Sequence, residues 1–262
     1  MTTRRALLIG SPGEEWEDRY CKGVLKDLDN YESFLKSPQG GYWYESEIIR
    51  LEKPTSYDVK LKVAEIASYD YTYIVFSGHG YMLQENQYSA PKNILELRQG
   101  YELDADELRV NANKRTIVLD CCREVYNISG QKISSSCESF QARAFADSKP
   151  RVLNSQECRY YYDKKIDECS NGIITKHSSS IGETSGDDEV IGGHYISSLL
   201  ESAEAWTQKM LRTGEDRYYY NYNVVTAHNE AKPKTTKKKA TQTPYIVKSK
   251  SEPYFPFAIV SF

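Results

Sequence analysis

The sequence predicts an α/β fold built around a mostly parallel sheet. Short apolar runs of strand length alternate along the chain with longer stretches of helical periodicity, a pattern typical of parallel strands joined by right-handed helical crossovers. A chain of 262 residues is long enough for one α/β domain, or for one such domain carrying a long insertion. With 39% hydrophobic and 27% charged residues it can bury a core and still cover its surface, so we expect a globular protein.

The first half of the chain gives the clearer element pattern. Apolar runs predict strands at 4–10, 46–55, 71–80 and 116–122. Helical spacing predicts a helix from about Glu14 to Lys36 and a short one over 104–111. A third helix should run through VKLKVAEIASY, with Thr55 or Ser56 as its cap.

Beyond Arg123 the pattern is looser. Residues 125–171 are polar and have no clear strand rhythm, and IITKHSSS then predicts a strand at 173–180. A polar loop leads into a helix over 194–206, and PYFPFAIVSF predicts a final strand. Residues 230–243 are expected to form a basic, solvated loop, so we assign no function to the lysines at 237–239.

Charge and motifs exclude several classes of protein. The net charge of −3 argues against a general nucleic-acid binder, and no apolar run approaches the ~20 residues of a membrane helix. We therefore expect a cytoplasmic protein without a membrane partner. Its six cysteines should be free thiols, no metal-ligand spacing is present, and no phosphate-binding glycine motif follows the first strand.

Two of the predicted strands end in residues that can form a catalytic pair. His79 follows YTYIVFSG, with Gly78 and Gly80 on either side of it, and Cys121 and Cys122 follow TIVLD. In an open α/β sheet the carboxyl ends of the strands border the ligand crevice. A thiol and an imidazole at that edge are the nucleophile and the base of a cysteine hydrolase.

Six ordered sequence blocks carry a family resemblance. They are RRALLIG, KGVLKDLDNYESFL, FSGHG, LDCC, SSSIGETSGDDEVIGGHYISSLL and TPYIVKSKSEPYFPFAIV. With these blocks the chain resembles bacterial members of the caspase/metacaspase superfamily of cysteine proteases. The resemblance implies a three-layer α/β/α sandwich in a single domain over 1–262. It also implies a division into a large-subunit-like part at 1–124, a linker-like segment at 125–171 and a small-subunit-like part at 172–262.

The same resemblance implies roles for the residues at the strand ends. In the D-x-C box of metacaspases the nucleophile stands two residues after the aspartate, which here is Cys122. His79 would be its base, and the backbone N–H groups of Gly80 and Cys122 would form the oxyanion hole. Cys121 should face away, because successive strand residues alternate sides. Arg123 and Glu124 depart from the small residues that often follow the nucleophile, which leaves the shape of the primed side open.

The resemblance also implies a substrate class. Asp120 and Asp27 match the acidic residues of the metacaspase specificity pocket, with Asp187 and Asp188 as further candidates. Carboxylates in a pocket favour a guanidinium or an ammonium group, so cleavage after Arg or Lys is expected. The alternative is a catalytically silent scaffold with the same fold. No cofactor is expected, a calcium requirement is left open, and compact bacterial relatives suggest an anti-phage cell-death role with a gasdermin-like partner.

The linker-like segment suggests a form of control. It contains Lys132, Arg143, Lys149 and Arg151, each of which an enzyme with a basic P1 preference could cut. Exposed polar segments are common sites of nicking, so self-cleavage within 125–171 is one expectation. An ordered helical insertion without a processing role is the alternative.

Overall fold

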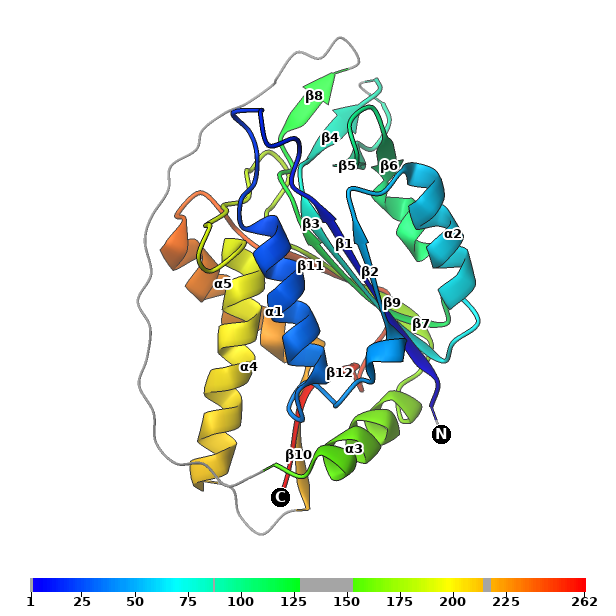
Figure 1. Ribbon diagram of the computed structural model, residues 1–262, viewed down its shortest axis with the longest axis vertical. Helices are drawn as coiled ribbons and strands as arrows, with labels where there is room; N and C mark the ends of the chain where they lie inside the picture. Colours follow the sequence, from blue (N-terminus) through cyan, green and yellow to red (C-terminus); the bar gives the residue numbers. More distant parts are fainter. Residues whose placement is uncertain (1, 87, 128–152, 214–217) are drawn as a thin grey trace.

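A six-stranded sheet forms the centre of the computed structural model, which describes residues 2–86, 88–127, 153–213 and 218–262 (Figure 1). Its strands lie in the order β11-β9-β7-β3-β1-β2. All neighbouring pairs are parallel except the edge strand β11, which runs antiparallel to β9. The bounds of these strands are β1 (Arg4–Ser11), β2 (Ile48–Glu52), β3 (Tyr71–Gly78), β7 (Lys114–Asp120), β9 (Gly172–His177) and β11 (Tyr245–Lys248).

Helices cover both faces of this sheet, which confirms the predicted mostly parallel α/β fold. One face carries α1 (Val24–Lys36), α4 (His194–Thr213), α5 (Val224–Lys238) and, near one end, α3 (Ser155–Asp167). The other face carries α2 (Ser56–Ile66) and the short 3-10 helix η2 (Ala105–Arg109). A second short 3-10 helix, η1 (Glu45–Glu47), precedes β2.

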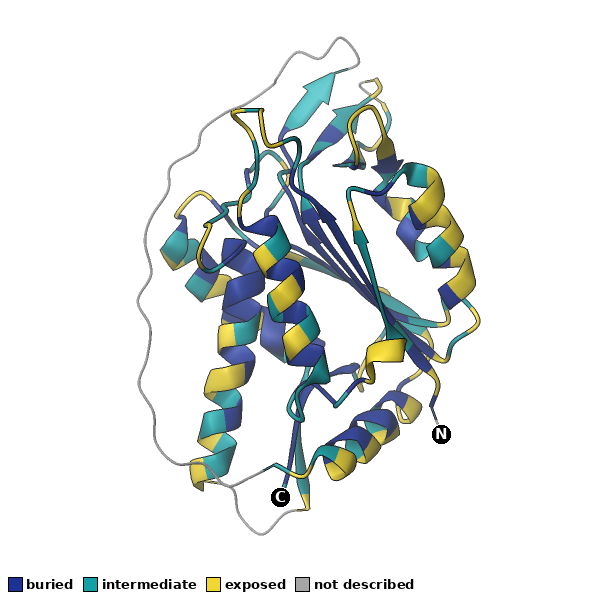
Figure 2. Ribbon diagram, viewed as in Figure 1, coloured by how far each residue is buried: buried dark blue, intermediate teal, exposed yellow. Residues whose placement is uncertain are grey.

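Strand alternation divides the core into two layers. On β1, Ala6 and Leu8 pack with α1, α3, α4 and α5, whereas Leu7 and Ile9 pack with α2 and η2. Successive side chains of a strand point to opposite faces, so a fully apolar strand can serve both layers. Figure 2 shows the result as a sheet whose central strands are almost entirely buried.

Two smaller sheets complete the fold, and neither was predicted. A four-stranded sheet contains β4 (Gly80–Gln84), β5 (Lys92–Glu96), β6 (Glu102–Asp104) and β8 (Val125–Asn127) in the order β6-β5-β4-β8. The second pairs β10 (Tyr219–Asn223) with the predicted final strand, β12 (Pro256–Ser261). β8 also corrects the expectation that residues 125–171 lack a strand, because Val125 pairs with Met82 of β4.

The first predicted helix begins ten residues later than expected, at Val24. The amide of Cys21 donates to the carbonyl of Pro12 at 2.9 Å, which closes residues 12–21 into a loop. The polar side chains of this loop have partners elsewhere in the molecule: Glu14 pairs with Lys53, and Arg19 with Glu96. Residues 12–23 therefore form turns and loop in place of the first part of the predicted helix.

The prediction of a loop over residues 230–243 was wrong for residues 230–238 and correct for residues 239–243. The helix α5 runs to Lys238, and Asn223 caps it by accepting from the amides of Val225 and Thr226. Ala231 and Thr235 are fully buried on its inner face, while Lys232 and Lys237 are exposed. The cap at Thr55 was predicted correctly, since its hydroxyl accepts from the amide of Asp58 at 3.2 Å.

Part of the linker-like segment is helical. Asn154 caps α3 by accepting from the amide of Glu157, and Cys158, Tyr162 and Ile166 of this helix are fully buried. The four basic residues at 132, 143, 149 and 151, together with Cys137, lie outside the described residues. Among the helices of the described ranges, none is long and apolar enough to cross a membrane.

Lys176 on β9 is a fully buried lysine in this core. Its Nζ donates to Tyr73 Oη at 3.3 Å and lies 4.6 Å from the centre of the Phe257 ring. Burial lowers its pKa to about 7 from the ordinary 10.5. The unfolded chain therefore keeps a proton that the folded chain releases above about pH 7.

We therefore expect the free energy of unfolding to rise with pH above about 7, by up to ~1.4 kcal/mol per pH unit, until the unfolded pKa is reached. Lys176→Met should remove this rise, because a neutral side chain of similar length fills the same space. Urea denaturation at a series of pH values measures it. An equal pH slope in the variant and the wild type would contradict the assignment.

Candidate active site

The parallel register of β3 and β7 brings His79 and Cys122 to the same edge of the sheet. Ser77 pairs with Asp120, and each of the two candidate residues follows two positions later. The chain leaves the sheet at both points: β3 ends at Gly78 and β7 at Asp120. Both side chains are partly exposed, as a reactive group at a sheet edge requires.

Cys122 lies against the loop that follows β9. The amide of Ser185 donates to its Sγ at 3.3 Å, and the sulfur lies 3.9 Å from the Ser185 carbonyl. Arg123 and the loop are paired through two backbone hydrogen bonds of 2.8 Å, one with Glu183 and one with Gly182. Burial raises the pKa of Cys122 to about 11, so its thiol is protonated at neutral pH in this arrangement.

Cys121 points into the core on the α2 side and is 1% exposed. A Cβ added to Gly80 would lie 3.0 Å from its Sγ, so the start of β4 packs directly on this cysteine. Its carbonyl accepts from the hydroxyls of Ser178 and Ser179, both at 3.2 Å. Its neighbours are thus those of a structural side chain.

Arg123 and Glu124 also have structural partners. The Arg123 guanidinium donates to the Ser179 carbonyl at 3.2 Å, and the Glu124 carbonyl accepts from the Met82 amide at 2.8 Å. Both residues are buried. They tie the start of β8 to its neighbours.

The His79 ring contacts a residue that the sequence reasoning did not single out. Cys21 Sγ lies 3.5 Å from Nε2 and 3.8 Å from Nδ1 of this ring. Cys21 comes from the loop after β1, which returns to the same sheet edge as β3 and β7. The position of that loop at the carboxyl end of a central strand was the signal that could have identified Cys21.

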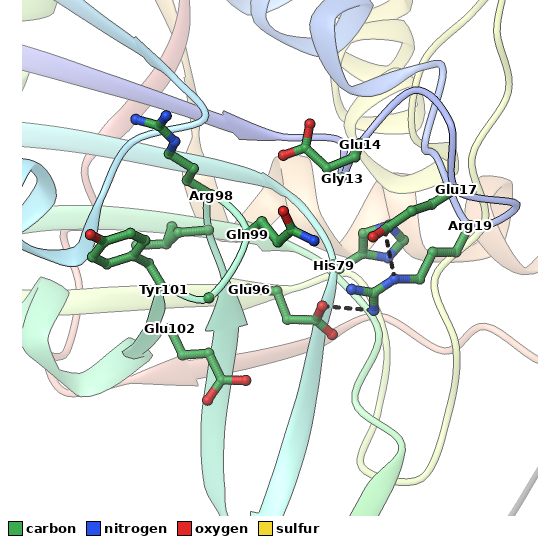
Figure 3. A pocket seen from close by; sticks show the side chains of 12 residues that line it. Gly13, Glu14, Glu17, Arg19, His79, Glu96, Arg98, Gln99, Tyr101 and Glu102 are labelled. Atoms are coloured by element: carbon green, nitrogen blue, oxygen red, sulfur yellow. Dashed lines mark hydrogen bonds and ion pairs between the residues drawn. The ribbon is translucent and has the colours of Figure 1, made fainter.

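A cavity of about 270 Å³ opens on the side of His79 that faces the loop before α1. Figure 3 shows Arg19 at its wall between Glu17 and Glu96, with ion-pair distances of 3.3 and 2.7 Å. The wall is completed by residues of the loop after β1 and of the segment that joins β5 to β6. They are Gly13, Glu14, Leu97, Arg98, Gln99, Gly100, Tyr101 and Glu102.

Asp27 and Asp120 lie together beneath the loop of residues 182–193. Gly193 sits between them: a Cβ there would be 2.5 Å from Asp120 Oδ2 and 3.0 Å from Asp27 Oδ2. Asp27 accepts from the Gly193 amide at 2.8 Å and from the Ser77 hydroxyl at 2.6 Å. Asp120 accepts from the Ser185 hydroxyl and from the Ile196 amide. In the described part of the chain, neither carboxylate forms an ion pair.

The energetics of these two acids are unfavourable in isolation. Burial, with the charge of the neighbouring acids, raises the pKa of Asp27 well above its ordinary value and that of Asp120 to about 6. A buried carboxylate without a cation is a cost to stability that functional sites often retain.

Asp187 and Asp188 have different surroundings. Asp187 accepts from the Gly23 amide at 2.9 Å, and burial raises its pKa; its neighbours include Cys21, Asp27 and His79. Asp188 caps its own turn by accepting from the amides of Val190 and Ile191. Asp187 therefore belongs to the cluster around Asp27, whereas Asp188 stabilises the loop.

Gln242 is a further residue that the sequence did not reveal. It is fully buried, and its side chain joins the Ser178 carbonyl, the Ser185 hydroxyl and the Gly186 amide at distances of 2.9 to 3.0 Å. It thereby holds the loop beside Cys122.

The five described cysteines are free thiols. In the described ranges, no group of three or more acidic, cysteine or histidine side chains could hold a metal ion.

Comparison with known proteins identifies the family. The model of the caspase domain, a C14 peptidase family, matches residues 3–255. The chain belongs to the caspase-domain family. Membership makes this caspase-domain protein a cysteine-type peptidase that acts on protein substrates.

A solved structure shares the fold of this caspase-domain protein. The crystal structure of caspase-1 from Spodoptera frugiperda superimposes with a TM-score of 0.54 and 12% sequence identity, over 94% of this chain and 86% of that one. No curated protein sequence matches the chain.

Proposed function

We propose that this protein is an endopeptidase in which Cys122 is the nucleophile and His79 its base. The observation that carries the proposal is the register of β3 and β7, which puts both residues two positions beyond a paired Ser77 and Asp120. His79 takes the thiol proton as Cys122 Sγ attacks the scissile carbonyl carbon. It then gives that proton to the leaving amine as the C–N bond breaks, and water hydrolyses the thioester. The backbone N–H groups of Gly80 and Cys122 would stabilise the oxyanion.

We further propose cleavage after Arg or Lys. The buried Asp27 and Asp120 and the half-buried Asp187 form an acidic cluster next to the nucleophile, and in the described residues none of them forms an ion pair with a basic side chain. A guanidinium or ammonium group would supply the missing cation, whereas a P1 aspartate would add to the repulsion. A fluorogenic peptide panel that varies only P1 tests this. A folded protein that cleaves no member of the panel would favour the scaffold alternative.

His79→Ala should lower kcat/KM by at least ~10²-fold, the low end for loss of a general acid–base group. The side chain is partly exposed, so the domain should remain folded, which its thermal melting checks. The rate of Cys122 alkylation by iodoacetamide between about pH 5 and about pH 8 reports directly whether His79 activates the thiol. An identical pH profile in wild type and variant would rule out His79 as the group that activates the thiol.

Self-cleavage within 125–171 remains a proposal, as does the division into parts at 1–124 and 172–262. Should the segment be cut, β7 and β9 would still pair from Lys114 with Gly172 to Leu119 with His177. We therefore expect the fragments to stay associated. Mass spectrometry of a concentrated sample measures whether the segment is cut, and gel filtration measures whether the fragments stay associated. Cys122→Ala, treated in the same way, is the control. A fully active, intact 30.1 kDa species would exclude self-cleavage as the activating step.

The biological setting rests on the resemblance to bacterial members alone. We propose a cytoplasmic role in anti-phage cell death, with a gasdermin-like pore former as substrate. Incubation of such a protein with the wild type and with Cys122→Ala tests it, and calcium added to the same assay tests a requirement for that ion.

A further inference from the structure

The proposed base has a partner other than the proposed nucleophile. Within the described residues, both hydrogen-bond-range contacts of the His79 ring are with Cys21 Sγ, and both such contacts of Cys122 Sγ are with Ser185. Direct proton transfer from Cys122 to His79 would therefore require these two side chains to come closer together than in this arrangement.

The loop that carries Cys21 is anchored at several points. The Cys21 amide donates to the Pro12 carbonyl at 2.9 Å, and Arg19 forms an ion pair with Glu96 of β5 at 2.7 Å. Gly23, just beyond it, donates to Asp187 at 2.9 Å. The Arg19 ion pair and the Gly23 hydrogen bond thus fix the chain on either side of Cys21, between His79 and the acidic cluster.

The chemistry of this thiol suits a partner that must later be released. Burial and the neighbouring acids raise the pKa of Cys21 far above its ordinary value, so it stays neutral. A neutral thiol forms only a weak hydrogen bond with an imidazole and does not stabilise the imidazolium. The contact with Cys21 therefore competes with the pairing of His79 and Cys122 that would activate the nucleophile.

We infer that Cys21, on the loop before α1, is a positioning residue that holds the His79 side chain in the resting enzyme. Catalysis begins when His79 exchanges its contact with Cys21 for a contact with Cys122. The inference rests on the proposed His79–Cys122 pair. Substrate would assist the exchange, because a P1 cation that binds Asp187 competes with the Gly23 hydrogen bond that anchors the Cys21 loop.

The test is the alkylation rate of Cys122 by iodoacetamide as a function of pH, resolved by peptide mass spectrometry so that Cys21 does not contribute. Cys21→Ala should raise the rate at neutral pH about 2-fold, which corresponds to the low end of the net strength of a hydrogen bond, and should move the profile to lower pH. Cys21→Ser retains a hydroxyl for His79 and should match the wild type or fall below it. The matched control is Cys169→Ala. Cys169 lies just after α3, and its buried thiol contacts the Lys165 carbonyl.

Two further results would decide against the inference in distinguishable ways. If Cys21→Ala and Cys21→Ser both keep the wild-type profile while His79→Ala changes it, the pair stands but Cys21 does not position the base. If His79→Ala also keeps the wild-type profile, the pair itself is wrong, and this inference fails with it. A slower rate in Cys21→Ala, with unchanged melting temperature, would equally overturn the resting-state role.

Discussion

Cys122→Ala should lower peptide cleavage by about 10⁴-fold or more, the order of loss when a protease loses its nucleophile. Cys121→Ala should keep most of the wild-type activity. The two thiols are adjacent in sequence but differ in surroundings: Cys121 is buried against Gly80, and Cys122 is partly exposed beside Ser185. A fluorogenic peptide with Arg at P1 measures both variants.

Stability must be followed in the same experiment, because the two variants differ in burial. Cys121→Ala removes a buried side chain and should lower the melting temperature, whereas Cys122→Ala should alter it little. Assays well below both melting temperatures separate folding from catalysis. An active Cys122→Ala together with an inactive, folded Cys121→Ala would reverse the assignment of the nucleophile.

Asp120→Asn should reduce kcat/KM for Arg and Lys substrates far more than any turnover of peptides with a neutral P1. Removing one partner of a desolvated charge pair costs roughly 2 to 5 kcal/mol, which is about 30-fold to a few thousand-fold. The variant should also remain folded. The pKa of Asp120 is raised to about 6, so the ionised carboxylate destabilises the folded state above that pH, and a neutral amide removes the cost.

The same carboxylate predicts a pH dependence in the wild type. As the pH falls through about 6, Asp120 takes up a proton and loses its attraction for a P1 cation. The preference for Arg over a neutral P1 should therefore weaken on acidification, and Asp120→Asn should lack this change.

Asp188→Asn is the matched control for the acidic cluster. It removes one carboxylate charge from the loop of residues 182–193, but the Asp188 side chain accepts from the amides of its own turn, at 2.8 and 3.0 Å. We expect its P1 preference to equal that of the wild type. A wild-type preference for Asp at P1 would refute the acidic-pocket proposal.

The predictable part of the fold was the part set by local patterns. The runs that became β1, β3 and β7 have apolar centres and are buried over nearly their whole length, as central strands covered on both faces are. The extent of α1 and the helix α5 were missed for the opposite reason. Residues 14–23 have helical spacing but are held in a loop by Lys53 and Glu96, and the polar sequence of α5 hides a narrow buried face at Ala231 and Thr235.

The short strands of the two smaller sheets were missed because their signal is weak. β4 and β8 are half-exposed and pair over a long sequence separation, and β10 is rich in Tyr and Asn rather than alternating apolar and polar residues. Strand identity in such segments depends on the partner that supplies the hydrogen bonds.

The sequence by itself determined the central strands β1, β2, β3, β7 and β9 and the placement of His79 and Cys122 just beyond strand ends, because hydrophobic periodicity and chain direction are local properties. Only the tertiary structure decided what surrounds those residues. Cys21 on His79, Ser185 on Cys122, and Asp27 beside Asp120 across Gly193 all join segments far apart in the chain. Such contacts depend on how loops return to one sheet edge, and no periodicity in the chain encodes that return.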